Sequence, residues 1–193
     1  FGTTGIINPG DGKIIYSIPL RIDSVYDFID RISDRTDVPL FLENDANCCA
    51  WGELAFHKRS TLKNFLYVLV EFRDRTGNDD SRYGGISVGM GFVMNHRIYR
   101  GGQGIGMELG HTKVQLDGAL CRCGQRGCLE AYVADYALVR EATTALNLTS
   151  RETQSVNILL ESLYDHAKAG NAAARSIFHR AGRYLALGLA NVV

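Results

Sequence analysis

One histidine and three cysteines in a short, glycine-containing segment constrain this chain more than any other feature. They follow the spacing His-x9-Cys-x-Cys-x4-Cys and are His111, Cys121, Cys123 and Cys128. One imidazole and three thiolates form the tetrahedral, soft ligand set that suits structural zinc. Gly124 and Gly127 allow the chain to turn back so that the last cysteine can join the first two. The pattern predicts a zinc-binding loop over residues 108–130.

The alternative for these cysteines is a disulfide or a set of unrelated buried thiols. Cys121 and Cys123 are too close in sequence to pair easily, and no secretory signal is visible. With all four ligand positions filled by protein, no open position is left for an activated water, so the predicted zinc is structural. Free cysteines and a thiolate metal site fit a reducing cytoplasm.

Composition excludes several classes of protein. The 193 residues fit one or two domains, and an apolar content of 46% is enough to form a core. The 21 acidic and 21 basic residues give zero formal charge, so no basic surface indicates nucleic-acid binding. No run approaches the length of about 18 apolar residues that a membrane span needs, so no membrane contact is expected.

Periodicity and turn residues predict an α/β protein. Strands are expected at 4–8, 12–16, 39–42, 65–72 and 85–99. Helices are expected at 24–35, 46–56, 128–146, 155–169 and 171–193. Asn44 or Asp45 is expected to cap the helix that begins at Ala46, and Gly170 to separate the last two helices. The polar stretch 73–83 lacks the acidic spacing of a calcium loop and is interpreted as a solvated loop.

Three blocks resemble one family. Glu108-Leu109-Gly110-His111, with the Cys-x-Cys-Gly and Gly-Cys-Leu-Glu that follow, is similar to the signature of the ROK family. Residues 38–47 resemble the family's strand that carries Asn-Asp into a helix, and residues 95–101 resemble the hairpin that precedes the zinc segment. The resemblance runs from about residue 5 to the C-terminus. The family comprises bacterial sugar kinases and sugar-responsive transcriptional repressors. The resemblance implies an actin-like, ribonuclease-H-like sugar kinase fold.

The resemblance also implies a sugar site. Its predicted ligands are Asn44, Asp45, Glu108, His111 and Glu130. Carboxylates, an amide and an imidazole can discriminate between the hydroxyl groups of a sugar, because a missing hydroxyl leaves a buried polar group unpaired. In the kinases of the family, the aspartate that matches Asp45 of this chain is the general base. Simpler roles stay open: Glu130 could favour a helix dipole, Glu108 could be a surface carboxylate, and Asn44-Asp45 could only cap a helix.

One departure from the family pattern separates enzyme from sensor. The kinases carry a Gly-Thr-Gly-x-Gly turn that holds phosphate through backbone amides and a hydroxyl. The matching positions here are 85–89, with Ile86 in place of threonine and Ser87 in place of the central glycine. Gly89 and Gly91 survive, so a shifted phosphate loop stays open. The substitutions favour a protein that binds sugar without phosphorylating it.

The sequence therefore predicts the sugar-sensing part of a ROK-type transcriptional regulator, binding a hexose, an amino sugar or a derivative. The alternatives are a kinase that uses magnesium-ATP with Asp45 as base, and a sugar-binding protein without a DNA-binding part. The chain begins and ends within apparent elements, so we expect a fragment without the phosphate motif or DNA-binding domain of its relatives. DNA contact is expected only through an upstream domain. The helices over 155–193 present apolar faces that suit a homodimer or higher homo-oligomer.

Overall fold

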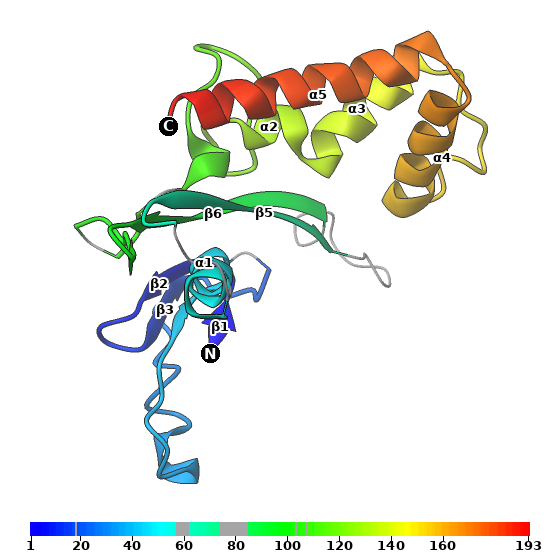
Figure 1. Ribbon diagram of the computed structural model, residues 1–193. Helices are drawn as coiled ribbons and strands as arrows, with labels where there is room; N and C mark the ends of the chain where they lie inside the picture. Colours follow the sequence, from blue (N-terminus) through cyan, green and yellow to red (C-terminus); the bar gives the residue numbers. More distant parts are fainter. Residues whose placement is uncertain (18, 57–61, 74–84, 103, 107) are drawn as a thin grey trace. The chain divides into compact units, whose positions relative to one another are not determined.

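The computed structural model describes residues 1–17, 19–56, 62–73, 85–102, 104–106 and 108–193 (Figure 1). These residues divide into two units, which are described in turn. The first contains residues 1–69 and 89–108, apart from the gaps just given. The second contains 70–73, 85–88 and 109–193. Of the polar stretch predicted as a solvated loop, all but Arg73 lies outside the described residues.

The first unit begins with two small strand pairs. β1 (Gly2–Thr3) pairs in parallel with β4 (Glu43–Asn44). β2 (Ile6–Asn8) pairs antiparallel with β3 (Lys13–Tyr16), which confirms the predicted hairpin. The Asn8 side chain holds the turn, because its Oδ1 accepts the backbone N–H groups of the two residues after Pro9 at 3.1 and 3.3 Å.

The helix predicted over 24–35 is wrong. Tyr26 and Ile14 exchange backbone hydrogen bonds of 3.0 and 2.8 Å, and the only helical turn in this stretch is a 3₁₀ turn at Ser33–Arg35. Two apolar side chains of the stretch, Phe28 and Ile29, pack against a core that contains Ile7, Ile14, Leu42 and Ile22, whereas Val25 is 57% exposed. The apolar spacing is that of a helix, but Tyr26 bridges to Ile14 of β3 and residues 28–32 form turns instead.

The segment from Pro39 to Leu42 is not the strand that was predicted, because only Glu43–Asn44 pair with β1. Leu42 is buried, whereas Phe41 is 75% exposed. α1 (Asp45–Phe56) follows directly. Asn44 Oδ1 accepts the N–H groups of the second and third residues after it at 3.0 and 3.3 Å, which confirms Asn44 as the cap.

A three-stranded sheet has the order β5 (Phe65–Arg73), β6 (Gly85–Met94) and β7 (Arg97–Ile98). The single strand predicted over 85–99 is therefore two strands. Asn95 and His96 separate them, with φ of 51° and 60°, the two left-handed residues of a tight hairpin turn. In the first unit this turn returns the chain, so that Ile98 packs beside Val93 and Ala50.

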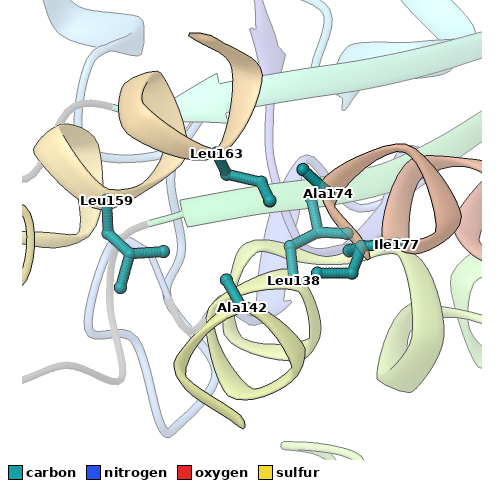
Figure 2. Packing of buried hydrophobic residues seen from close by; sticks show 6 residues of the cluster. All are labelled: Leu138, Ala142, Leu159, Leu163, Ala174 and Ile177. Carbon is teal, nitrogen blue, oxygen red and sulfur yellow. The ribbon is translucent and has the colours of Figure 1, made fainter. Parts of the chain in front are cut away.

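The second unit is mainly helical. It contains α2 (Glu130–Val133), α3 (Asp135–Ala145), α4 (Val156–Lys168) and α5 (Ala172–Ala190). α5 runs along α2 and α3 and also contacts α4 (Figure 1). Figure 2 shows the core that joins the last three helices, formed by Leu138, Ala142, Leu159, Leu163, Ala174 and Ile177.

The one helix predicted over 128–146 is two helices. Ala134 is extended, with ψ of 163°, and separates α2 from α3. Contacts from elsewhere in the unit fix α2: the Tyr132 ring stacks on Tyr184 with centroids 4.0 Å apart, and its hydroxyl accepts the N–H of Ala119 at 2.7 Å. Alanine itself favours helix, so this break arises from tertiary contacts and could not be read from local propensity.

The last two helices begin within one residue of the predicted positions, but α5 ends at Ala190 rather than at 193. Ser155 caps α4 through the N–H of Ile158 at 3.2 Å, and Asn171 caps α5 through the N–H of Ala174 at 3.1 Å. Gly170, with φ of 93°, ends α4 in the left-handed conformation that glycine adopts readily. Among the described residues, no helix is long and apolar enough to cross a membrane.

Truncation of the helical core tests this packing. Leu163 is fully buried at the centre of the cluster in Figure 2. We expect Leu163→Ala to lower the free energy of unfolding of the second unit by about 2–5 kcal/mol, because it removes apolar contacts and leaves a cavity. Leu187→Ala on α5, where the side chain is 44% exposed, is the matched control and should cost far less. Equal losses in urea unfolding would contradict the assigned core.

Candidate metal and ligand sites

The predicted metal ligands come together in the second unit. His111, Cys121, Cys123 and Cys128 each offer one ligand atom, and the four atoms all lie within 4.8 Å of one another. The Sγ atoms of Cys123 and Cys128 are 3.8 Å apart, as are Cys121 Sγ and His111 Nδ1. A tetrahedral site with zinc–sulfur bonds of about 2.3 Å separates its sulfurs by roughly 3.8 Å. The cluster could therefore hold a metal ion.

Local hydrogen bonds build this cluster from a short sequence. The backbone N–H of Cys121 donates to Gln125 O at 2.8 Å, and the N–H of Gly124 donates to Cys121 O at 3.0 Å. The loop then turns at Gly127, which has φ of 75°, and where a Cβ would lie 1.7 Å from Gln115 O. No residue but glycine fits that position. All five cysteines of the chain are free, so the disulfide alternative is wrong.

Polar side chains surround the sulfur atoms. Lys113 Nζ donates to Cys128 Sγ at 3.3 Å, and the hydroxyl of Tyr136 donates to Cys121 Sγ at 3.7 Å. The guanidinium of Arg122 lies over the Tyr136 ring, 4.3 Å from its centroid. Such donors orient thiolates and offset their negative charge. Lys113 and Tyr136 thus each place a hydrogen-bond donor against one of the candidate ligand sulfurs.

The imidazole and one thiol of the cluster shift each other's pKa through a hydrogen bond. The hydrogen bond with Cys121 raises the pKa of His111 to about 9, although burial acts in the opposite direction. Burial alone would raise the pKa of the Cys121 thiol, but hydrogen bonds from His111 and others lower it to about 7. Burial and the neighbouring sulfurs raise the pKa of Cys123 to about 11. A bound metal would replace these protons, so its binding would release them.

Glu130 lies beside the histidine of the cluster. It is the first residue of α2, and its Oε2 would be 3.4 Å from a Cβ built on Gly110, the residue before His111. Its negative charge also contributes to the raised pKa of His111. The structure thus brings His111 and Glu130 together in the second unit. α2 is a single turn, so a favourable helix dipole is a small effect there.

A separate polar pocket lies within the first unit. It is lined by Gly5, Ile6, Ile7, Asn44, Asn47, Gly89, Met90, Gly104, Ile105, Gly106 and Glu108. Two of the predicted sugar ligands, Asn44 and Glu108, are therefore brought to one pocket, although they are far apart in sequence. Asp45 is the neighbour of Asn44 and opens α1, with its Oδ1 2.8 Å from the N–H of Ala46. It is not among the lining residues.

Sequence reasoning missed three residues of this region. Asn47 lines the pocket and is only 5% exposed, and its Nδ2 donates to Glu43 Oε1 at 3.1 Å. Glu43 Oε2 accepts the Nε–H of Arg100 at 2.6 Å. Glu43 and Asn47 are four residues apart across the start of a predicted helix, which was a usable signal. No such signal in the sequence pointed to Arg100, because only the fold brings this residue to Glu43.

The segment compared with the phosphate turn of the kinases is part of β6. Residues 85–89 are extended, and Gly89 lines the pocket of the first unit. Gly91, the other glycine kept from the kinase pattern, is required at its position by close packing. A Cβ on it would lie 2.5 Å from Ala46 O and 2.7 Å from Ala50 Cβ, so a larger residue would push β6 off α1. Its survival is therefore no indication of phosphate binding.

The α/β chain thus combines a cysteine–histidine cluster that could hold a metal ion with a small pocket lined in part by polar side chains. The model of the ROK family matches residues 1–193, so the chain belongs to the ROK family. The fold is the actin-like fold of the ROK sugar kinases. A ROK family glucokinase from Streptomyces griseus, solved in complex with glucose and AMPPNP, superposes with a TM-score of 0.73 and 26% identity over 99% of this chain and 59% of that one.

Relatives of known role fall into two groups. The chain is 28% identical to the xylose repressor of Bacillus subtilis, over 98% of this chain and 44% of the repressor. It is also 28% identical to a glucokinase of Streptomyces coelicolor, over 84% of this chain and 50% of the kinase. The chain thus spans about half the length of the curated relatives it matches. Repressors and sugar kinases are both among them.

Proposed function

We propose that the chain is the sugar-binding part of a ROK-type transcriptional regulator. The observation that carries the proposal is the pocket of the first unit, which both Asn44 and Glu108 line. An amide offers both a donor and an acceptor, and a carboxylate offers acceptors, which suits hydroxyl groups. The similarity to a xylose repressor supports a monosaccharide ligand. Asp45, His111 and Glu130 remain proposed sugar ligands on the family resemblance.

A regulator is favoured over a kinase by the residues at 85–89. Ile86 and Ser87 stand where a threonine and a glycine would hold phosphate, and Gly91 is explained by packing. In this proposal, sugar binding shifts the DNA-binding state of a homodimer, and DNA is contacted by another part of the protein. The protein would act in the cytoplasm, where its genes and free sugars are.

The alternative is a sugar kinase that uses magnesium-ATP. It is favoured by the match to a glucokinase structure that contains glucose and AMPPNP. Asp45 would then accept the proton of the sugar hydroxyl that attacks the phosphoryl donor. Asp45 opens α1 beside Asn44, so its position next to a pocket residue is compatible with either function.

We further propose that zinc is the ion of the cysteine–histidine cluster. Three thiolates and one imidazole at near-tetrahedral spacing suit zinc, and four protein ligands leave no position for water. When bound, the ion would supply structural stability rather than reaction chemistry. His111 would coordinate through Nδ1, which leaves Nε2 for another hydrogen bond. The metal would thereby fix the segment between η2 (Leu109–His111) and α2.

Calorimetric titration of the full-length protein tests the function. The panel is glucose, xylose, N-acetylglucosamine, N-acetylmannosamine and their phosphates, each with and without magnesium-ATP, followed by an assay for ADP. We expect at least one sugar to bind and no ADP to be released, since the phosphate-holding residues are replaced. Sugar-dependent ADP release would establish the kinase instead. Absence of any binding would remove the sugar pocket altogether.

A further inference from the structure

A chain of polar contacts lies behind the pocket of the first unit. Arg100 bonds to Glu43 Oε2 through Nε and pairs with it through a terminal nitrogen, each at 2.6 Å. Glu43 Oε1 accepts the Nδ2–H of Asn47 at 3.1 Å. The same oxygen accepts the backbone N–H of Asn44 at 3.0 Å. One carboxylate therefore connects an arginine to two residues that line the pocket.

This arrangement fixes which way the Asn47 amide faces. An ionised carboxylate paired with arginine has only acceptors, so the amide must turn its NH₂ group toward Glu43. The carbonyl Oδ1 of Asn47 then faces away from Glu43. Among the bonds of the described residues, none uses this oxygen, and Asn47 lines the pocket. A residue that lines the pocket thus carries an acceptor whose orientation is set by Glu43.

Arg100 also holds a second wall of the same pocket. Its backbone carbonyl accepts the N–H of Gly106 at 2.8 Å. The two backbones approach so closely that a Cβ on Gly106 would lie 2.6 Å from the carbonyl carbon of Arg100. Gly104, Ile105 and Glu108, which line the pocket, belong to the same loop. Arg100 thus joins the loop that carries Glu108 to the start of α1.

We propose that Glu43 and Arg100 are positioning residues, and that Asn47 is the specificity-determining residue they orient. Asn47 presents Oδ1 to one hydroxyl of the ligand, which must donate a proton to it. A ligand with hydrogen or fluorine in place of that hydroxyl is rejected, because neither can donate. The inference rests on the proposed sugar pocket and adds the direction of one hydrogen bond to it.

The pair contributes to orientation more than to stability. The Arg100 side chain is 43% exposed and that of Glu43 16%. Partly exposed ion pairs stabilise proteins little. Substitution of Glu43 should therefore leave the fold intact, and a change in ligand preference can be read directly.

The test compares glucose and xylose with their monodeoxy and monodeoxyfluoro analogues. In the wild type, one position should lose about tenfold or more in affinity with either analogue, the size expected for a lost hydrogen bond in a buried setting. In Glu43→Gln the side chain at 43 carries its own NH₂, so Asn47 can reverse. The affinity lost with the fluoro analogue at that position, relative to the parent sugar, should then be less than about threefold; we call this loss the penalty of the analogue. An unchanged penalty overturns the proposal.

Two further variants separate orientation from a general effect. Lys13→Met breaks another exposed ion pair of the same unit, with Asp27 at 2.8 Å, and should leave every penalty unchanged. Asn47→Ala should remove the penalty, and adding Glu43→Gln to it should change nothing more. Additive effects of the two substitutions would show that Glu43 does not act through Asn47.

Nuclear magnetic resonance tests, without any sugar, whether Arg100 and Glu43 orient Asn47; we call this set of contacts the relay. The side-chain NH₂ signals of Asn47 should shift in both Glu43→Gln and Arg100→Met, and should stay unchanged in Lys13→Met. If these signals shift but no sugar binds to the wild type, the relay stands and the proposed function fails. If sugar binds but these signals do not respond to Arg100→Met, the function stands and the relay is refuted.

Discussion

Cys123→Ser is expected to abolish metal binding and to destabilise the second unit. Cys123 is exposed and does not belong to the buried hydrophobic cluster formed by Cys121, Cys128, Ala131 and Tyr132. Its loss therefore removes a ligand without disturbing packing. We expect the free energy of unfolding to fall by about 4 kcal/mol or more, as for other lost metal sites. That corresponds to a melting temperature lower by roughly 8–16 °C.

The measurement is metal content after gel filtration, together with thermal melting with and without a chelator. The wild type should lose stability with chelator, and Cys123→Ser should not respond to it, because its site is already lost. Cys48→Ser is the matched control: it is a free cysteine on α1, outside the cluster, and should keep the metal. Full metal content in Cys123→Ser would remove that residue from the ligand set.

Asp45→Asn is expected to weaken sugar binding while preserving the fold. The amide oxygen of asparagine can still accept the N–H of Ala46, which Asp45 Oδ1 accepts at 2.8 Å. A hydrogen bond to a charged group contributes about 1.5–3 kcal/mol, so affinity should fall by about ten- to a hundredfold. If the protein is a kinase, ADP release should fall by roughly a hundredfold or more, since the general base is lost.

Glu53→Gln provides the comparison for this variant. Glu53 is an exposed carboxylate on the same helix, so the change of charge on α1 is the same. Calorimetry should give it the affinity of the wild type, and its metal content should be unaltered. If Asp45→Asn binds sugar as tightly as Glu53→Gln, Asp45 acts only at the start of the helix and has no contact with ligand.

Local sequence predicted the elements whose signals are local. Ser155 and Asn171 start their helices, Gly170 ends one, and Asn44 caps α1, because each effect involves residues within one turn. The prediction over 24–35 was wrong for the opposite reason. Apolar residues at helical spacing met a strand that offered backbone partners, and the pairing of Tyr26 with Ile14 prevailed.

The break at Ala134 illustrates the same limit. Alanine at the centre of a helical pattern gives no signal for an end. The break arises because Tyr132 is held by Tyr184 and Ala119, which are distant in the chain. The hairpin turn at Asn95 and His96 is a different case: the apolar pattern predicted one strand over 85–99, whereas the family resemblance of residues 95–101 indicated a hairpin.

The candidate metal cluster could be predicted from the sequence alone, because His111, Cys121, Cys123 and Cys128 lie within one short segment and glycines permit its turns. Chemistry and spacing there leave one sensible arrangement. The pocket of the first unit was decided by tertiary structure. Its walls come from segments far apart in the chain, and only folding places Arg100 against Glu43 and so sets the direction of Asn47. A hydrogen bond between distant segments leaves no periodic pattern in the sequence, so its direction is decided only when the chain folds.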